Sequence, residues 1–202
     1  MTKLLFLLHI FVSSLFLWVL VSACSSSPKV NYYSLYSTPP GKSVEKSKNS
    51  IVLSVGPVKL PDVLNTPKIA TGGTDGVYNF SESHRWTGAV DSDFAHALAE
   101  TLAIELDTEK IGIYPVGTHL KPNCRVLIEI LAMNGDLGKE ARLTVRWTLI
   151  DPHGKMEPII QRSQLSGQLS DAGYGTWVKR QHDNIQQLGV EIATLVRERF
   201  TP

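Results

Sequence analysis

The sequence predicts an α+β fold in which a mainly antiparallel sheet packs against two amphipathic helices as a two-layer sandwich. Residues 141–150 alternate strictly between apolar and polar side chains, as a strand with one buried face does. Residues 91–107 and 175–200 instead repeat apolar residues with the 3.6-residue period of helices that bury one face. Because a sheet face and a helix stripe can each bury their apolar side against the other, two packed layers follow.

Composition and charge are those of a globular protein. The chain has 202 residues, of which 43% are hydrophobic and 19% are charged, so wholesale disorder is excluded. Lys and Arg number 20 and Asp and Glu number 19, which leaves a net charge of +1. A chain this close to neutral has no overall field that favours nucleic acid or an anionic membrane surface, so we expect no nucleic-acid partner.

The N-terminus has the organisation of a bacterial export signal. Residues 4–21 carry no formal charge and follow Lys3, and their length lies between that of a signal peptide and that of a membrane-spanning helix. Residues 21–24 (VSAC) then resemble the lipobox at which bacterial lipoproteins are cleaved and lipidated. We therefore expect residues 1–23 to be a lipoprotein signal peptide and Cys24 to be the lipidated residue, with an uncleaved anchor as the alternative.

Two further residues bear on location and on cysteine chemistry. Ser25 stands where an Asp would resemble the signal that retains lipoproteins in the inner membrane, so the outer membrane is favoured. Cys124 is the only cysteine besides Cys24. No disulfide framework or cysteine-based zinc site is therefore possible within one chain, and we expect Cys124 to be a small buried apolar residue.

We predict three parts along the chain. They are the signal peptide (1–23), a lipidated tether with a short strand (24–50) and a single α+β periplasmic domain (51–202). Within the tether, residues 32–36 are aromatic enough for a strand, and residues 37–50 have the composition of a solvated loop.

The domain begins with β structure. Residues 51–58 are apolar and β-branched, which predicts a strand that prolines stop. Residues 61–71 should be extended backbone. The glycine-rich turn at 72–76 leads into residues 77–81, so a hairpin is expected there.

Two helices are expected, one in the middle of the domain and one at its end. Asp91 and Asp93 mark the start of the first, because acidic residues favour helix N-termini. Gly189 is the only interior weakness of the second. The apolar positions of the first are Phe94, Leu98, Leu102 and Leu106, and one face of the second is marked by Val178, Gln181, Ile185, Leu188, Ile192, Leu195, Val196 and Phe200.

The remaining strands are predicted at 111–116, 124–133, 141–150 and 158–169. Because 124–133 is apolar on both alternating faces, it suits the centre of a sheet. The last three follow one another as an antiparallel meander.

No cluster of metal-binding or catalytic residues stands out. The five histidines beyond the signal peptide occur singly, without the paired spacing of a metal site. The glycine-rich turn lacks the spacing of a phosphate-binding loop, and the chain has no G-x-S-x-G nucleophile motif. We therefore expect a protein that is not an enzyme and that uses no metal or other cofactor.

A polar and aromatic segment, ESHRW, lies between the predicted hairpin and the first helix, and two interpretations of it are open. In the structural one, Trp86 covers the sheet edge and Arg85 pairs with an acid such as Asp91 or Asp93. In the functional one, His84, Arg85 and Trp86 contact a partner or a second subunit, because Arg and Trp are enriched where binding energy concentrates.

An ordered set of short motifs resembles one known family. The motif YYSL follows the lipobox, VGPVKLP at residues 55–61 precedes Leu64-x-x-Pro67-x-Ile69, and HRW and then LAETL come next. In this order they are similar to the PqiC family, also described as ABC-type transport auxiliary lipoproteins or the YmbA family. The similarity covers nearly all of the mature chain. The family usually has Asp-Arg where this chain has Asn65-Thr66.

The resemblance implies an outer-membrane lipoprotein that works with an MCE-domain tunnel protein and inner-membrane transport components to move lipids across the periplasm. It also implies a ring-like homo-oligomer. We therefore expect the domain to dock the tunnel at the outer membrane while the acyl chains on Cys24 hold it to the inner leaflet. The alternative is a generic envelope lipoprotein that binds a secreted protein or a cell-wall glycan.

Overall fold

The computed structural model describes residues 9, 29–36, 51–117 and 120–200. Cys24, all of the predicted signal peptide except His9, and the predicted loop at 37–50 lie outside the described residues. None of the helices in the described part of the chain is long and apolar enough to cross a membrane.

The larger sheet has five strands in the order β5-β2-β6-β7-β8. Strand β2 pairs in parallel with both β5 and β6, whereas β6 with β7 and β7 with β8 are antiparallel and form the longest ladders. As predicted from its two apolar faces, β6 lies at the centre. The strands are β2 (Leu53–Lys59), β5 (Ile111–Ile113), β6 (Cys124–Asn134), β7 (Glu140–Ile150) and β8 (Ile159–Gln168).

The smaller sheet has three strands in the order β1-β4-β3: β1 (Asn31–Tyr33), β4 (Tyr78–Trp86) and β3 (Lys68–Gly72). Strands β3 and β4 form the predicted hairpin, and β1 pairs in parallel with the end of β4. The predicted extended segment before the hairpin contains a short 3₁₀ helix, η1 (Asp62–Leu64). Backbone hydrogen bonds between Gly72 and Gly135, 2.8 and 2.9 Å long, connect the two sheets.

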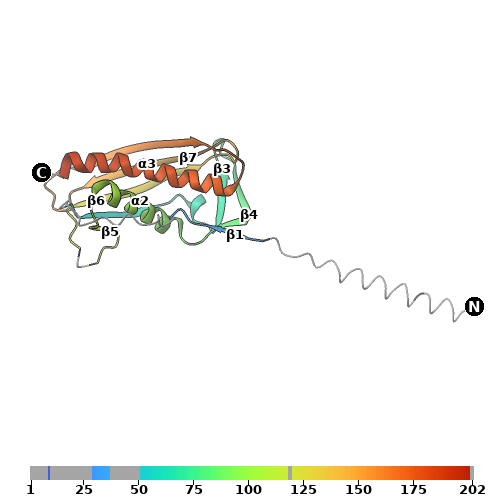
Figure 1. Cartoon of the computed structure of the whole chain (residues 1–202), viewed down its shortest axis with the longest axis horizontal. Helices are drawn as coiled ribbons and strands as arrows, with labels where there is room; N and C mark the ends of the chain where they lie inside the picture. The colour runs from blue at the N-terminus through green and yellow to red at the C-terminus, as the bar shows by residue number, and fades with distance from the viewer. Residues whose placement is uncertain (1–8, 10–28, 37–50, 118–119, 201–202) are drawn as a thin grey trace, which may run out of the picture.

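Two helices, α2 (Val90–Leu106) and α3 (Tyr174–Phe200), pack against each other and against one face of the larger sheet. Figure 1 shows α3 running along the length of the strands with α2 beside it. Helix α2 begins after Ala89, which makes no side-chain capping bond, and ends at Asp107 in the left-handed conformation. The predicted apolar positions of both helices are buried or partly buried.

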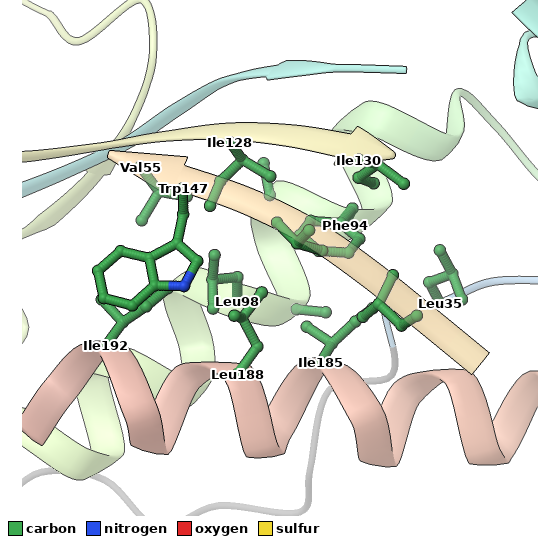
Figure 2. Packing of buried hydrophobic residues seen from close by; sticks show 14 of the residues in the cluster. Leu35, Val55, Phe94, Leu98, Ile128, Ile130, Trp147, Ile185, Leu188 and Ile192 are labelled. Atoms are coloured by element: carbon green, nitrogen blue, oxygen red, sulfur yellow. The ribbon is translucent and has the colours of Figure 1, made fainter. Parts of the chain in front are cut away.

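The core lies between the helices and the sheet. Figure 2 shows Trp147 and Ile128 pointing from the sheet toward Leu188 and Ile192 of α3, with Leu98 of α2 between them. The alternation predicted for residues 141–150 is confirmed, because Leu143, Val145, Trp147 and Leu149 are all buried. Cys124 is also buried, as expected.

The α+β class is confirmed, with both predicted helices present in residues 51–200, and the structure adds two features. Half of the strand pairings are parallel, so both sheets are mixed. Leu35 is completely buried in the same core as the helices, because its backbone is held by both of them: Asp93 Oδ2 of α2 accepts from its N–H at 3.3 Å, and His182 Nδ1 of α3 lies 2.8 Å from its carbonyl. Part of the segment predicted as tether therefore contributes to the domain.

Candidate functional site

The residues singled out as a partner contact, His84, Arg85 and Trp86, form the last three positions of β4. They therefore belong to a strand and not to a connection between hairpin and helix. Their Cα partners in β1 are Asn31, Tyr32 and Tyr33, and α3 begins close by. We call this region, where β1, β4 and the first turn of α3 meet, the β4 corner.

The His84 ring is stacked between two tyrosines. Its centroid lies 4.0 Å from that of Tyr174 with an interplanar angle of 14°, and 5.7 Å from that of Tyr33 with an angle of 29°. Its Nδ1 lies 3.0 Å from Ser81 Oγ and 3.1 Å from Ser83 Oγ. Because these contacts come from β1, β4 and α3, His84 joins three elements that are distant in the chain.

Trp86 is part of the core. Only 5% of it is exposed, and its ring lies 6.4 Å from that of the fully buried Trp177 of α3. Its backbone N–H donates to Pro67 O at 2.8 Å, and the following Thr87 N–H donates to Tyr33 O at 2.8 Å. A side chain this buried stabilises the domain and presents almost no surface to a partner, which favours the structural interpretation of Trp86.

Arg85, like His84, is partly exposed. Its Nε is buried without a hydrogen-bond partner, and among the described residues it makes no ion pair, so the predicted pairing with Asp91 or Asp93 is wrong. Asp93 is occupied by β1 instead, because its Oδ2 accepts from Ser34 Oγ at 2.7 Å. Arg85 is thus a partly exposed cation without an ion-pair partner among the described residues.

A nearby ion pair adds to the electrostatics of the β4 corner. Lys68 of β3 is the Cα partner of Arg85, and its Nζ lies 2.5 Å from Glu82 Oε1. The hydrogen bond from Lys68 holds the pKa of the Glu82 carboxyl below its ordinary value, and Arg85 contributes a smaller lowering. Lys68 therefore pairs directly with this carboxylate, whereas Arg85 acts on it only through its charge, without forming an ion pair.

Asn65 and Thr66, where the similar family usually has Asp-Arg, form a turn. The Asn65 N–H donates to Asp62 O at 3.0 Å and ends η1. Thr66 Oγ1 accepts from the Lys68 N–H at 3.3 Å. These bonds shape the chain as it enters β3.

Several side chains that position the corner were not singled out from the sequence. Ser34, Asp93 and His182 hold residues 34–36 against both helices through the bonds described above. They are 58 or more positions apart from their partners in the chain, so no local pattern reveals them.

Two further kinds of site, a metal site and a reactive thiol, bear on the chemistry of the described part of the chain. The described residues contain no group of three or more His, Cys, Asp or Glu side chains that could hold a metal ion. Burial raises the pKa of the Cys124 thiol to about 12, with a smaller contribution from Asp151, so this thiol is protonated and inert at neutral pH.

Comparisons with solved structures find the same fold at low sequence identity. A crystal structure of an uncharacterized protein superposes with a TM-score of 0.67 at 18% identity, covering 83% of this chain and 99% of that one. A protein from Xanthomonas campestris assigned to the family DUF330 superposes with a TM-score of 0.59 at 10% identity, covering 73% and 85%. At these identities the likeness establishes the fold alone.

At the level of sequence, no curated protein matches the chain. A family model described as "ABC-type transport auxiliary lipoprotein component" does match, over residues 33–193. The matched region runs from the last residue of β1 into α3 and so contains all of the larger sheet and, in the smaller sheet, β3, β4 and Tyr33 of β1.

Proposed function

The chain belongs to the family of ABC-type transport auxiliary lipoprotein components, and from this premise we propose that it is the outer-membrane member of a lipid-transport system that spans the periplasm. A lipoprotein of this family is anchored to a membrane of the cell envelope. Our proposal is that the membrane is the outer one, that the attachment point is Cys24, and that the domain docks an MCE-type tunnel protein there. The family match carries this proposal, supported by the lipobox at residues 21–24.

The mechanism we propose is positioning, without catalysis. The family is one of transport auxiliary lipoproteins and not a known enzyme family. If Cys24 is lipidated, the folded domain begins close to the bilayer, because β1 starts at Asn31. The six residues between them reach at most about 20 Å when fully extended. The domain would then hold its partner near the inner leaflet.

The β4 corner is the surface we propose for the partner or for a neighbouring copy in a ring-like homo-oligomer. Arg85 supports this proposal, because it is partly exposed, makes no ion pair among the described residues, and lies in register with the 61% exposed Tyr32. Arg and Tyr are residue types that often carry binding energy. His84 and Trp86 would support the surface from behind through their contacts with Tyr174 and Trp177.

Crosslinking in intact envelopes, followed by purification of the lipoprotein, tests the proposed system. An MCE-domain protein should be the main partner captured, and inner-membrane components should follow through it. A secreted protein or cell-wall glycan as the main product would contradict the proposal and support the generic envelope lipoprotein.

Substitution of Arg85 tests the proposed surface. Arg85→Ala should weaken the affinity for the partner or for a neighbouring copy by roughly tenfold or more, which lowers partner capture or native mass. The melting temperature should remain almost unchanged. Lys155→Ala, which removes an exposed cation from the loop before β8, is the matched control and should change neither. A folded Arg85→Ala protein with unchanged capture and native mass would remove the β4 corner from the interface.

Substitution of Cys24 tests the anchor. Cys24→Ser removes the thiol that accepts lipid, so the variant should incorporate no labelled fatty acid and should keep its signal peptide. Cys124→Ser is the control, because Cys124 is buried and should not accept lipid. Label on the Cys24→Ser protein would refute the lipobox interpretation.

A further inference from the structure

One face of the five-stranded sheet is free of both helices and carries a concentration of positive charge. Helices α2 and α3 contact each other and the same sheet face, toward which the buried residues of β7 point. The alternate residues of the strands therefore form the opposite face, which we call the open face. Its charged residues are the cations Lys59, Arg125, Arg142, Arg146 and Arg162 and the carboxylates Glu129 and Glu140.

Four of these residues form one row across the strands. The register pairs Lys59 with Glu129, Glu129 with Arg146, and Arg146 with Arg162. Glu129 is shared, since its carboxylate oxygens lie 3.6 Å from Lys59 Nζ and 2.7 Å from Arg146 Nη1. Arg146 and Arg162 are like charges directly opposite each other, a pairing that destabilises a sheet, and among the described residues only Arg146 of the two has a carboxylate partner, Glu129.

The adjacent row of the open face carries no charge and borders a surface hollow. Leu127, Thr148 and Ile160 are paired across β6, β7 and β8, and Ile160 is 65% exposed. Beside them is a hollow of about 270 Å³, whose lining includes Pro57, Lys59, Leu127 and Arg146. The open face thus combines arginines with the exposed Ile160 and the partly buried Leu127.

The near-zero net charge of the chain conceals this separation. Helix α2 has no Lys or Arg and carries four acids, Asp91, Asp93, Glu100 and Glu105. Part of the positive charge that balances these four acids in the net charge of the chain lies on the open face of the sheet. An anionic partner would therefore meet attraction at the open face and repulsion at α2.

We propose that the open face lies against the anionic phospholipid headgroups of the membrane to which the chain is anchored. Three of its cations, Arg142, Arg146 and Arg162, are arginines with a planar guanidinium group of the kind that binds phosphate with two hydrogen bonds. Arg125 is not counted with them, because its Nε is buried and its guanidinium lies over the Tyr114 ring. Ile160 and Leu127 match the less polar depth just below the phosphates. The inference rests on the anchor in the proposed function but not on the transport partner. A short anchor holds the domain within about 20 Å of the bilayer, so the membrane is the nearest anionic surface.

A thiol-accessibility experiment on the full lipidated chain tests this placement. The reporter is Thr148→Cys, at the centre of the open face, and the control reporter is Gln187→Cys, on the exposed side of α3. Neither native cysteine interferes, because Cys24 carries lipid and the Cys124 thiol is buried with its pKa raised to about 12. Each protein is reconstituted in phosphatidylcholine vesicles with or without phosphatidylglycerol and treated with a membrane-impermeant maleimide.

Phosphatidylglycerol should slow labelling of Thr148→Cys by about fivefold or more, since each cation near an anionic leaflet contributes roughly a fivefold factor in affinity. High salt should abolish the protection, and Gln187→Cys should label equally on both vesicles. Gln164→Cys, also on the open face, is a second reporter if Thr148→Cys does not fold.

Matched charge variants identify the residues responsible. Arg146→Gln with Arg162→Gln should remove the protection, whereas Lys179→Gln with Arg199→Gln removes the same charge from α3 and should retain it. Equal labelling on both vesicles, or equal loss in both double variants, would overturn the proposal. Protection that appears only when envelope proteins are added, and not with phosphatidylglycerol, would also overturn it and would indicate an acidic protein partner. Fatty-acid labelling and MCE-protein capture are measured separately, so failure of the proposed function is distinguishable.

Discussion

Gly189 of α3 packs closely against Thr101 of α2, and its replacement by Ala should destabilise the domain. A Cβ at position 189 would lie 2.5 Å from Thr101 Cγ2 and 2.9 Å from Thr101 Cβ. The Thr101 side chain cannot rotate away freely, because its hydroxyl donates to Ala97 O at 3.0 Å. The added methyl group must therefore push the helices apart or break this hydrogen bond.

The expected magnitude combines two opposing effects. Ala is favoured over Gly in a helix interior by about 1 kcal/mol, whereas an extra methyl group in a well-packed core costs about 1–3 kcal/mol. We expect a net loss on the order of 1 kcal/mol in the free energy of unfolding of Gly189→Ala. Gly175→Ala is the matched control in the same helix. Its nearest neighbour would be Tyr33 Cε1 at 3.9 Å, so it should be neutral or stabilising.

Urea unfolding of protein that starts at Ser25, followed by far-ultraviolet circular dichroism, measures both changes. Thr101→Ser keeps the hydroxyl and removes Cγ2, the methyl group that would lie 2.5 Å from the Cβ added in the Gly189→Ala variant. It should therefore recover part of the loss when combined with Gly189→Ala. A Gly189→Ala protein at least as stable as the parent would refute the close approach of the two helices at this point.

Three further predictions follow from burial and hydrogen bonding. Leu98→Ala should lower the free energy of unfolding in urea by about 2–5 kcal/mol, because Leu98 is fully buried. Glu100→Ala, on the more exposed side of α2, should lower it far less, and equal, small losses would contradict the packing of α2. The pKa of Asp171, beneath the start of α3, is lowered first by the hydrogen bond from Thr176 and then by that from the Gly173 N–H. The stability that its ionised carboxylate contributes is therefore present above pH about 4 and is lost as pH falls through the lowered pKa. The difference in melting temperature between the parent and Asp171→Ala should accordingly shrink in acid, and a difference independent of pH would refute this. In the native state Cys124 should not react with a thiol reagent at pH 8, and rapid labelling without denaturant would show that the residue is accessible.

Local patterns identified most of the elements because helix and strand periodicity are properties of neighbouring residues. The alternation in 141–150 predicted β7 and its buried face, and the 3.6-residue period predicted α2 and α3. Gln181 appeared as a polar residue on the apolar face of a predicted helix. The structure explains it, since its Nε2 donates to the carbonyls of Asn134 and Arg142 at the β6–β7 end of the sheet.

The candidate site was predicted in part. Residue types alone pointed to His84, Arg85 and Trp86, but their roles depend on burial, which the sequence does not specify. Trp86 is covered by Trp177 of α3, and Arg85 is left without the predicted acid because Asp93 is bonded to Ser34.

The amino-acid sequence by itself determined the order of elements, the apolar faces and the lipobox, because each of these depends on residues a few positions apart. Only the tertiary structure decided which strands pair in parallel, since β1 with β4 and β2 with β6 join segments separated by long stretches of chain. It also decided where charge gathers. Formal neutrality gave no hint of a cationic sheet face, because Lys59, Glu129, Arg146 and Arg162 become neighbours only when four strands come into register.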